Sequence, residues 1–220
     1  MRNATSNIAI DSAIETMRLG TLNYQSAWDL QKSIHNEVAN GSRKNSLLLL
    51  EHPPVYTAGR RTLIEERPTD GSEVIDVDRG GKITFHGPGQ IVGYPIVKLR
   101  ESENVVGFVR EIETSLIEVC NEFGIPGERY CERSGVWIRD GGGDRKIAAI
   151  GIRVAKGVTM HGFAINVDPD LSFYERIVPC GIKDASVTSM RKELNRQISI
   201  DEVIDVVETK ILSALARVSI

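Results

Sequence analysis

A glycine-rich segment, Arg79–Gln90, most constrains the fold of this chain. It contains four glycines in twelve positions and lies between two strand candidates, Val74–Val77 and Ile91–Leu99. Glycine permits positive φ angles and close approach of the backbone to a ligand. The pattern predicts a long loop, which is either a surface turn or part of a binding site. His86 and Gln90 favour the binding site, because a turn does not require such side chains.

Three amphipathic segments predict helices. Apolar residues recur at helical spacing in Asn23–Val38 and in Asn104–Phe123. Asn104 is a suitable N-cap for the second of these helices. The C-terminal helix begins with a capping box formed by Ser199 and Glu202. Its apolar face then runs to the end of the chain.

Clusters of strand candidates separate these helices. Ser46–Glu51 reads as a buried strand that stops before two prolines, because proline cannot donate to a ladder. Val136–Arg139 and Lys146–Val154 flank a glycine-rich turn and predict a hairpin. Val158–Val167 is a further strand. Strands in clusters, with helices between and after them, predict an α+β fold with a mixed or antiparallel sheet. No linker divides residues 1–220, so we expect one domain.

Composition excludes several classes of protein. The hydrophobic content of 41% and charged content of 26% are those of an ordinary soluble globular protein. The net charge of −3 argues against nucleic acid as the main partner, since a phosphate binder would be basic. The longest apolar run, Leu47–Leu50, is too short to span a membrane. We therefore expect neither a nucleic acid nor a membrane partner.

The three cysteines, Cys120, Cys131 and Cys180, give no disulfide framework and no C-x-x-C pair. A thiolate metal site is therefore not expected. The N-terminus lacks the apolar core of a secretory signal, which predicts a reduced, cytoplasmic setting. Cys120 falls in a predicted helix beside the apolar stripe, so we interpret it as a small buried hydrophobe.

Two further segments carry residues that chemistry can use. Lys146 precedes an apolar strand that ends at Gly151, and a second glycine-interrupted strand follows at His161–Val167. Strand glycines mark bulges or close approach of a ligand, although Lys146 alone would be typical of an exposed strand end. Cys180 stands between Pro179 and Gly181, in a loop setting where a thiol is accessible. It is either a passive cysteine or a nucleophile.

Together these motifs resemble the lipoyl(octanoyl) transferase family. The family pattern R-G-G-x-x-T-aromatic-H-G-P-G-Q-x-x-x-Y is complete from Arg79 to Tyr94. The upstream E-H-P-P-V-Y-T element begins at Glu51. The K-I-x-x-x-G, H-G-x-A-x-N-V and P-C-G elements follow at Lys146, His161 and Pro179. The order of the motifs makes the resemblance specific, whereas any one of them alone would be weak.

The resemblance implies the fold of biotin/lipoate protein ligase catalytic domains, a mixed sheet flanked by helices. It implies Cys180 as the acyl-thioester nucleophile and Lys146 as the cation that lowers its pKa. It also implies an acyl pocket with three stretches of residues. These are Arg79, Gly80, Gly81, Lys82, Ile83, Thr84, Phe85 and His86; Ala149, Ile150 and Gly151; and Gly162, Phe163 and Ala164.

The resemblance further implies octanoyl transfer without a cofactor or a metal. The donor would be octanoyl acyl carrier protein. The acceptors would be lysines of lipoyl domains, in 2-oxoacid dehydrogenase complexes and in glycine cleavage H protein. Two alternatives stay open: an ATP-dependent lipoate ligase of the same fold, and a non-catalytic module that binds an acyl carrier. The set of Cys180, Lys146 and His86 argues against both.

Overall fold

A mixed β-sheet forms the centre of the protein. The computed structural model describes residues 14–130, 133–177 and 185–220. In these residues the main sheet has the strand order β1-β2-β6-β10-β9-β8-β7, and β11 pairs with β9. The β1–β2 and β9–β11 pairs are parallel, and the other pairs are antiparallel. The strands are β1 (Ile14–Thr21), β2 (Asn45–Glu51), β6 (Gln90–Ile96), β7 (Glu128–Tyr130), β8 (Arg133–Ile138), β9 (Arg145–Ala155), β10 (Val158–Asn166) and β11 (Ser186–Val187).

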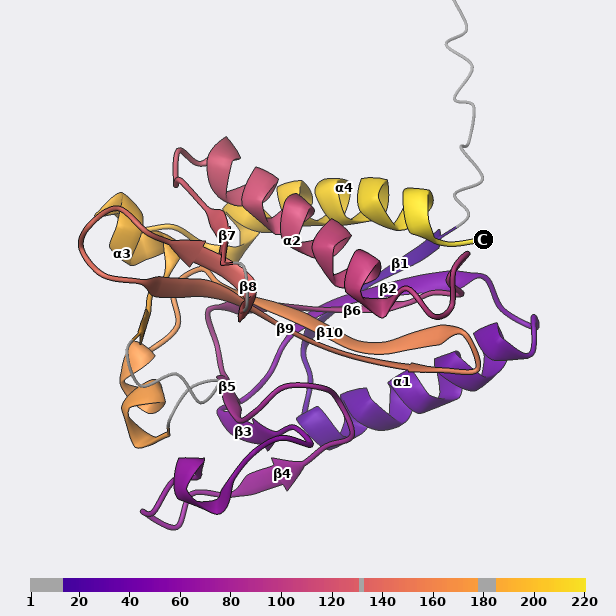
Figure 1. Ribbon diagram of the computed structural model, residues 1–220, viewed down its shortest axis with the longest axis horizontal. Coiled ribbons are helices and arrows are strands. Elements are labelled where there is room, and N and C mark those ends of the chain that lie inside the picture. The colour runs from indigo at the N-terminus through magenta and orange to yellow at the C-terminus, as the bar shows by residue number, and fades with distance from the viewer. Residues whose placement is uncertain (1–13, 131–132, 178–184) are drawn as a thin grey trace, which may run out of the picture.

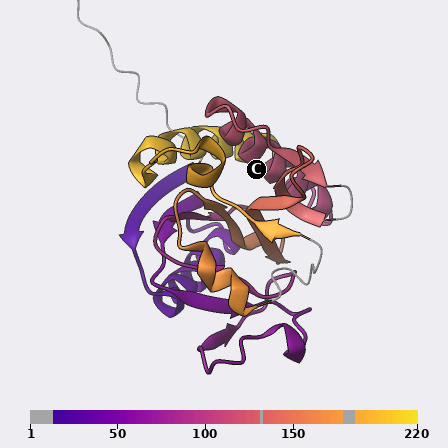
Figure 2. The ribbon, with the colours of Figure 1, turned by 90° about the vertical axis from the view of Figure 1, so that its left-hand side faces the viewer.

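Helices cover both faces of this sheet (Figure 1). Helices α2 (Val105–Glu122) and α4 (Ile200–Val218) lie together on one face, and α1 (Tyr24–Ala39) lies on the other. A view turned by 90° shows the same layers, with α2 and α4 above the sheet (Figure 2). The described residues also contain the short helical segments η1 (Ile64–Glu66), η2 (Leu171–Arg176) and α3 (Met190–Leu194). The predicted α+β class with a mixed sheet is confirmed.

The predicted helix starts are confirmed by their capping bonds. The side chain of Asn23 accepts a hydrogen bond from the N–H of Gln25 at the start of α1. Asn104 accepts from the N–H of Gly107 at the start of α2, and Gly124 follows α2 with a φ of 75°. Ser199 and Glu202 form both bonds of the capping box of α4. Each cap satisfies backbone N–H groups that the first turn of a helix leaves unpaired.

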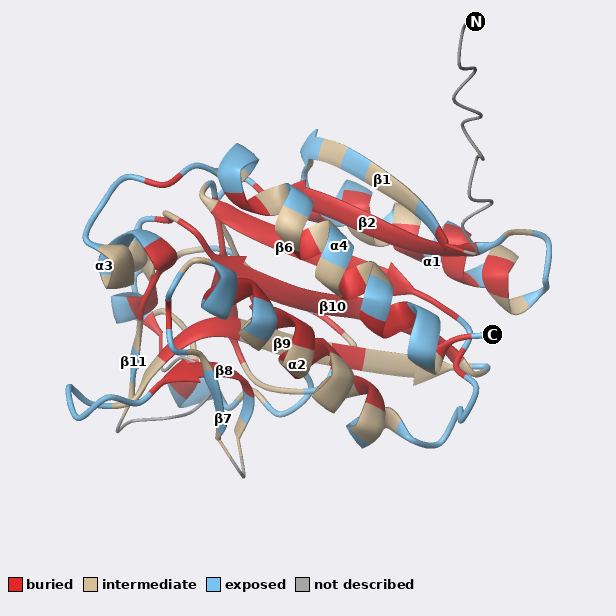
Figure 3. Ribbon diagram, turned by 90° about the horizontal axis from the view of Figure 1, so that it is seen from above, coloured by how far each residue is buried: buried red, intermediate tan, exposed pale blue. Residues whose placement is uncertain are grey.

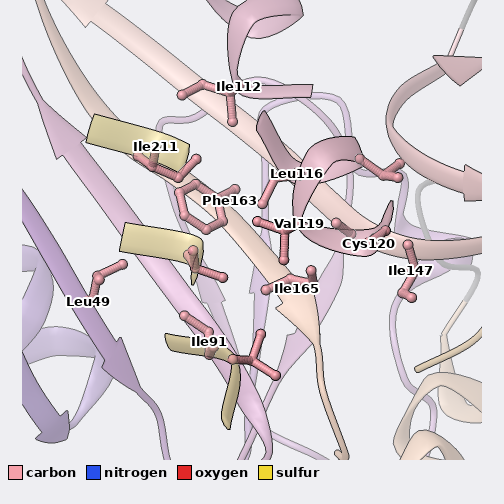
Figure 4. Packing of buried hydrophobic residues seen from close by; sticks show 14 of the residues in the cluster. Leu49, Ile91, Ile112, Leu116, Val119, Cys120, Ile147, Phe163, Ile165 and Ile211 are labelled. Atoms are coloured by element: carbon pink, nitrogen blue, oxygen red, sulfur yellow. The ribbon is translucent and has the colours of Figure 1, made fainter. Parts of the chain in front are cut away.

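The largest apolar core lies between the sheet and the α2–α4 layer. In it, Leu116 and Val119 of α2 and Ile211 of α4 pack on the strand residues Phe163 and Ile165 (Figure 4). Seen from the helix side, the central strands β2, β6 and β10 are buried, whereas the edge strand β1 and the outer faces of α2 and α4 carry exposed residues (Figure 3). Cys120 is fully buried in this core, which confirms its interpretation as a small hydrophobe.

A second sheet differs from the sequence prediction. Strands β4 (Val74–Asp76), β3 (Val55–Ala58) and β5 (Thr84–His86) form it, in that order. The segment Arg79–Gln90, predicted as one loop, therefore contains a short strand. Thr84–His86 becomes a strand because it pairs with β3, a contact that local pattern does not reveal. The second sheet and η2 enclose a small aromatic cluster around Phe85.

The described residues contain no helix with the length and apolar character needed to cross a bilayer. In the same part of the chain, no three His, Cys, Asp or Glu side chains gather closely enough to hold a metal ion.

Candidate active site

One pocket of about 510 Å³ collects most of the residues that the sequence singled out. This volume is within the usual range for a small-molecule site. Its floor is a cross-strand row in which Val92 of β6 pairs with Ala164 of β10, and Ala164 pairs with Ala149 of β9. Two positions further along the two strands, and so on the same face, Gly162 pairs with Gly151. Small side chains thus leave open space above the sheet.

Lys146 lies in the pocket wall near the start of β9. The residue is only 8% exposed, and its Nζ lies 4.6 Å from the centre of the Trp137 ring. Gly135 on β8 lies beside it: a Cβ there would clash with the carbonyl oxygen of Ala148 at 2.4 Å and would lie at an ordinary contact distance, 3.5 Å, from Cε of Lys146. Gly135 also has a φ of 112°, which side chains disfavour. The local geometry holds the Lys146 stem between β8 and the pocket.

Cys180 lies outside the described residues, so its contacts are not part of this structure. The chain downstream of it is described. Strand β11 begins at Ser186, six positions after Cys180, and pairs in parallel with β9 at Arg145 and Lys146. The N–H of Thr188 then donates to the carbonyl oxygen of Lys146 at 2.9 Å. The segment that follows the Pro-Cys-Gly motif is therefore anchored beside Lys146.

Arg79 fastens the glycine-rich loop to the neighbouring strands. Its Nη1 donates to the carbonyl oxygens of Gly80 and Lys82, and its Nη2 donates to both oxygens of Thr57. The side chain passes close to Gly151, where a Cβ would lie 2.7 Å from Cδ of Arg79. A buried guanidinium with several carbonyl acceptors stabilises the conformation of this loop.

The hydrogen bonds of His86 define its tautomer. The amide nitrogen of Gln90 donates to the carbonyl oxygen of Phe85 and to Oδ1 of Asn166, which turns Oε1 of Gln90 toward His86. Nδ1 of His86 therefore carries the proton and donates to that oxygen at 3.1 Å. Burial lowers the pKa of His86 well below its ordinary value, so the ring is neutral. Its Nε2 is left as an acceptor.

A second histidine is fixed in the same way behind the pocket. Nδ1 of His52 donates to the carbonyl oxygen of Leu22 at 2.6 Å, and the hydroxyl of Tyr94 donates to Nε2 at 2.7 Å. Burial lowers the pKa of His52 to about 4. The ring of Tyr24 stacks on His86 and tilts against His52. These rings form a rigid, neutral wall beside the floor of small residues.

His161 joins the loop to the strands of the floor. It has a φ of 58°, and its Nε2 donates to Oδ1 of Asp78 at 2.7 Å. Arg153 pairs with the other carboxylate oxygen of Asp78 at 2.9 Å. Burial lowers the pKa of His161, so the neutral ring is favoured. The loop is thereby tied to β9 and β10 immediately before Arg79.

The proposed acyl-pocket residues fall into two groups. Three of them do not line the pocket: Ile83 and Phe85 pack in the small aromatic cluster, and the N–H of Gly80 donates to Ile152 on β9. Phe163 lines the pocket, and its ring also packs over Gly93 in the main core. The others lie around the pocket with Lys146: Arg79, Gly81, Lys82, Thr84, His86, Ala149, Ile150, Gly151, Gly162 and Ala164.

Several pocket residues were not among the sequence candidates. Tyr24 belongs to α1, and Val92 belongs to β6. Tyr94 is the last residue of the family pattern that begins at Arg79, and this position was the signal that could have identified it. Helix α2 adds a further group, whose valines were predicted at most as part of the apolar stripe of that helix and whose charged residues were not predicted as site residues. That group is Val105, Val106, Val109, Arg110 and Glu113.

Solved structures with the same fold define the class of protein. Lipoate-protein ligase A bound with ATP superposes with a TM-score of 0.72 at 15% identity, over 92% of this chain and 85% of that one. Biotin protein ligase from Aquifex aeolicus in complex with biotin and ATP superposes with a TM-score of 0.54 at 15% identity, over 92% and 71%. The predicted biotin/lipoate ligase fold is confirmed.

Sequence comparison gives the family within that fold. The model of the lipoyl protein ligase A/B catalytic domain matches residues 23–212. The octanoyltransferase of Mycolicibacterium gilvum (strain PYR-GCK) is 59% identical over 213 residues, which are 94% of this chain and 89% of the relative. The octanoyltransferase of Salinispora arenicola (strain CNS-205) is 55% identical, over 90% and 93%. The chain belongs to the lipoyl(octanoyl) transferase family and is an acyltransferase.

Proposed function

We propose that this enzyme transfers an octanoyl group from acyl carrier protein to a lysine of a lipoyl domain, through a thioester on Cys180. The observation that supports it most is the place of Lys146, buried in the pocket wall beside the strand that follows the cysteine motif. The names of the relatives support the octanoyl group. The acceptors would be 2-oxoacid dehydrogenase complexes and glycine cleavage H protein, in a cytoplasm that keeps thiols reduced.

The first step exchanges one thioester for another. The Cys180 thiolate attacks the octanoyl carbonyl, and the phosphopantetheine arm leaves as a thiolate that takes up a proton from the Lys146 ammonium, so that Lys146 is a neutral amine before the second step. A thiol with a pKa of about 8.5 is only a few per cent ionised near pH 7. An ammonium beside Cys180 favours its charged form. This is the role proposed for Lys146.

The second step makes an amide. The acceptor lysine attacks the acyl-enzyme as a free amine, Cys180 leaves as a thiolate, and the amine loses one proton. Lys146 is the group proposed to accept and release that proton. The neutral His86, with its Nε2 as an acceptor, is proposed to order the glycine loop against the thioester rather than to act as the main base. No step consumes ATP.

Intact mass spectrometry after mixing with octanoyl carrier protein, without ATP, tests this proposal. We expect one octanoyl adduct on the wild type and on Cys120→Ala, because Cys120 is buried and burial raises its pKa to about 12. We expect no adduct on Cys180→Ala. An adduct that persists on Cys180→Ala would exclude the nucleophile. Transfer that starts only after ATP is added would favour a ligase.

A further inference from the structure

The pocket extends to both faces of the main sheet. Val92, Tyr94 and Ala164 belong to the apolar cluster on the α1 face. Ile150 packs instead with the cluster on the α2 face. We call the first part the acyl lobe. The second part, the α2 lobe, is formed by Val105, Val106, Val109, Arg110 and Glu113 of α2 with Ile150, Arg133 and Ser134.

The two lobes meet at a stretch of the β9 edge on which no strand pairs among residues 14–130, 133–177 and 185–220. The pairing of β8 with β9 ends at Val136–Ala148. The next backbone hydrogen bond on this edge of β9 is the 3.1 Å bond from the N–H of Gly80 to the carbonyl oxygen of Ile152. Backbone groups alternate sides along a strand, so the N–H and C=O of Ile150 point the same way as those of Ile152. The main chain of Ile150 therefore faces the passage between the lobes.

Lys146 stands close to this passage. Gly135, which lies beside the Lys146 stem, donates its N–H to Oε1 of Glu113 on α2 at 3.0 Å. Glu113 is fully buried and pairs with Arg110 at 2.6 Å. A thioester held at Lys146 would have its acyl chain on one side of β9 and its thiol component on the other.

The α2 lobe has a defined chemical character. Three valines give it an apolar wall, and Val106 is 71% exposed although it is aliphatic. Arg110 and Arg133 place two cations on the same lobe. The β9 edge at Ile150 offers a backbone donor and acceptor. A ligand for this lobe would be narrow and partly apolar, would carry amides, and would end in an anion.

We propose that the α2 lobe binds the phosphopantetheine arm of the acyl donor. This inference rests on the proposed function, because the arm is the thiol component of that donor. The geminal methyl groups of the arm would contact the valines, and its amides would pair with the main chain of Ile150. Its phosphate would lie by Arg110 and Arg133. The exposed Val106 is then an apolar contact that is completed when the donor binds.

A variant that places a negative charge near the proposed phosphate position, and so repels the phosphate, tests this proposal. Val106→Glu places a carboxylate on the lobe at an exposed position, so the fold should be retained. The matched control is Ile220→Glu, because Ile220 is also an exposed aliphatic residue, at 66%, and does not line the pocket. Each protein is mixed with S-octanoyl-phosphopantetheine or with S-octanoyl-2-mercaptoethanol, which lacks the arm. The rate of octanoyl capture is followed by intact mass spectrometry.

We expect Val106→Glu to lower kcat/KM for the donor with the arm by roughly tenfold. Its rate with the donor that lacks the arm should stay within about twofold of the wild type, and Ile220→Glu should match the wild type with both donors. Equal losses with both donors, or no loss with either, would overturn the inference. If the wild type captures octanoyl from neither donor, the proposed function itself fails.

Discussion

The two faces of the main sheet bury different kinds of side chain. The face toward α2 and α4 carries the larger apolar cluster, which includes Leu116 and Ile211. On the face toward α1, the apolar cluster is smaller. Buried polar groups such as His52, His86 and His161 lie beside it, each with a hydrogen-bond partner.

This difference separates stability from chemistry. Apolar burial contributes about 25 cal/mol per Å² of surface removed from water, so the α2–α4 face can stabilise the fold by packing alone. A buried polar group costs free energy unless its hydrogen bonds are made. The α1 face and the pocket contain such buried polar groups, namely neutral histidine rings and the Lys146 cation, and their hydrogen bonds and contacts hold them in position for the reaction. Damage to the core between α2, α4 and the sheet, away from the pocket, should therefore change stability, and damage to the pocket residues should change the rate.

The largest expected effect is on catalysis, from Lys146→Ala. Loss of a positioned acid–base group costs about 10²–10⁴-fold in rate, and we expect octanoyl transfer to fall within that range. The measurement is the rate of octanoyl transfer to an isolated lipoyl domain. The control Lys210→Ala removes an α4 lysine that pairs with Glu118 and Glu122, and it should keep the wild-type rate. A wild-type rate in Lys146→Ala would contradict the assignment of catalysis to the pocket residues.

The core between α2, α4 and the sheet is tested by Leu116→Ala. Leu116 is fully buried between α2 and the sheet, and such truncations cost about 2–5 kcal/mol through lost burial and a residual cavity. Urea denaturation should show this loss in the free energy of unfolding, while transfer per folded molecule stays close to wild type. Leu63→Ala, at a position that is 50% exposed, should change stability by less than about 0.5 kcal/mol. A folded Leu116→Ala that has lost activity would contradict the comparison.

A smaller effect concerns acid stability on the α1 face. The folded-state pKa of His52 is about 4, against 6.5 for the free side chain. The unfolded chain therefore binds more protons in this interval, and the stability that is complete above pH 6.5 is lost as the pH falls toward 4. This one group accounts for roughly 3 kcal/mol of that loss.

His52→Gln isolates that contribution. Glutamine can donate to Leu22 and accept from Tyr94 as His52 does, but it does not take up a proton. Urea denaturation between pH 4 and pH 6.5 should show a shallower decline of stability for the variant than for the wild type. Parallel declines would mean that other groups, such as His86, dominate the acid sensitivity of this face.

The helices could be predicted from sequence because their signals are local. The predicted caps Asn104 and Ser199 precede periodic apolar stripes and stand where the structure has them. Strand β5 could not be predicted in the same way, since it exists only through its pairing with β3. The floor of the pocket depends on the register of β6, β9 and β10, which no local pattern contains.

The candidate site shows the same division. The motifs picked out Lys146 and His86, which line the pocket, because residue type and glycine spacing are visible in the chain. They also included Phe85, which packs on Phe173 with ring centres 4.5 Å apart, away from the pocket. The stripe of α2 placed Val105 and Val109 with the core residues. Their position on the pocket depends on where β8 ends beside β9, which is a property of the tertiary structure.

The pairing of Lys146 with Cys180 is the central claim, and the pH profile of Cys180 alkylation tests it most directly. The alkylation rate is measured in a Cys120→Ala, Cys131→Ala background, so that Cys180 is the one thiol that can react. With Lys146 present, we expect the midpoint of the profile to lie below the ordinary thiol pKa of about 8.5. Lys146→Ala should move the midpoint up toward that value. Superimposable profiles with and without Lys146 would contradict the account, even if Cys180 carries the acyl group.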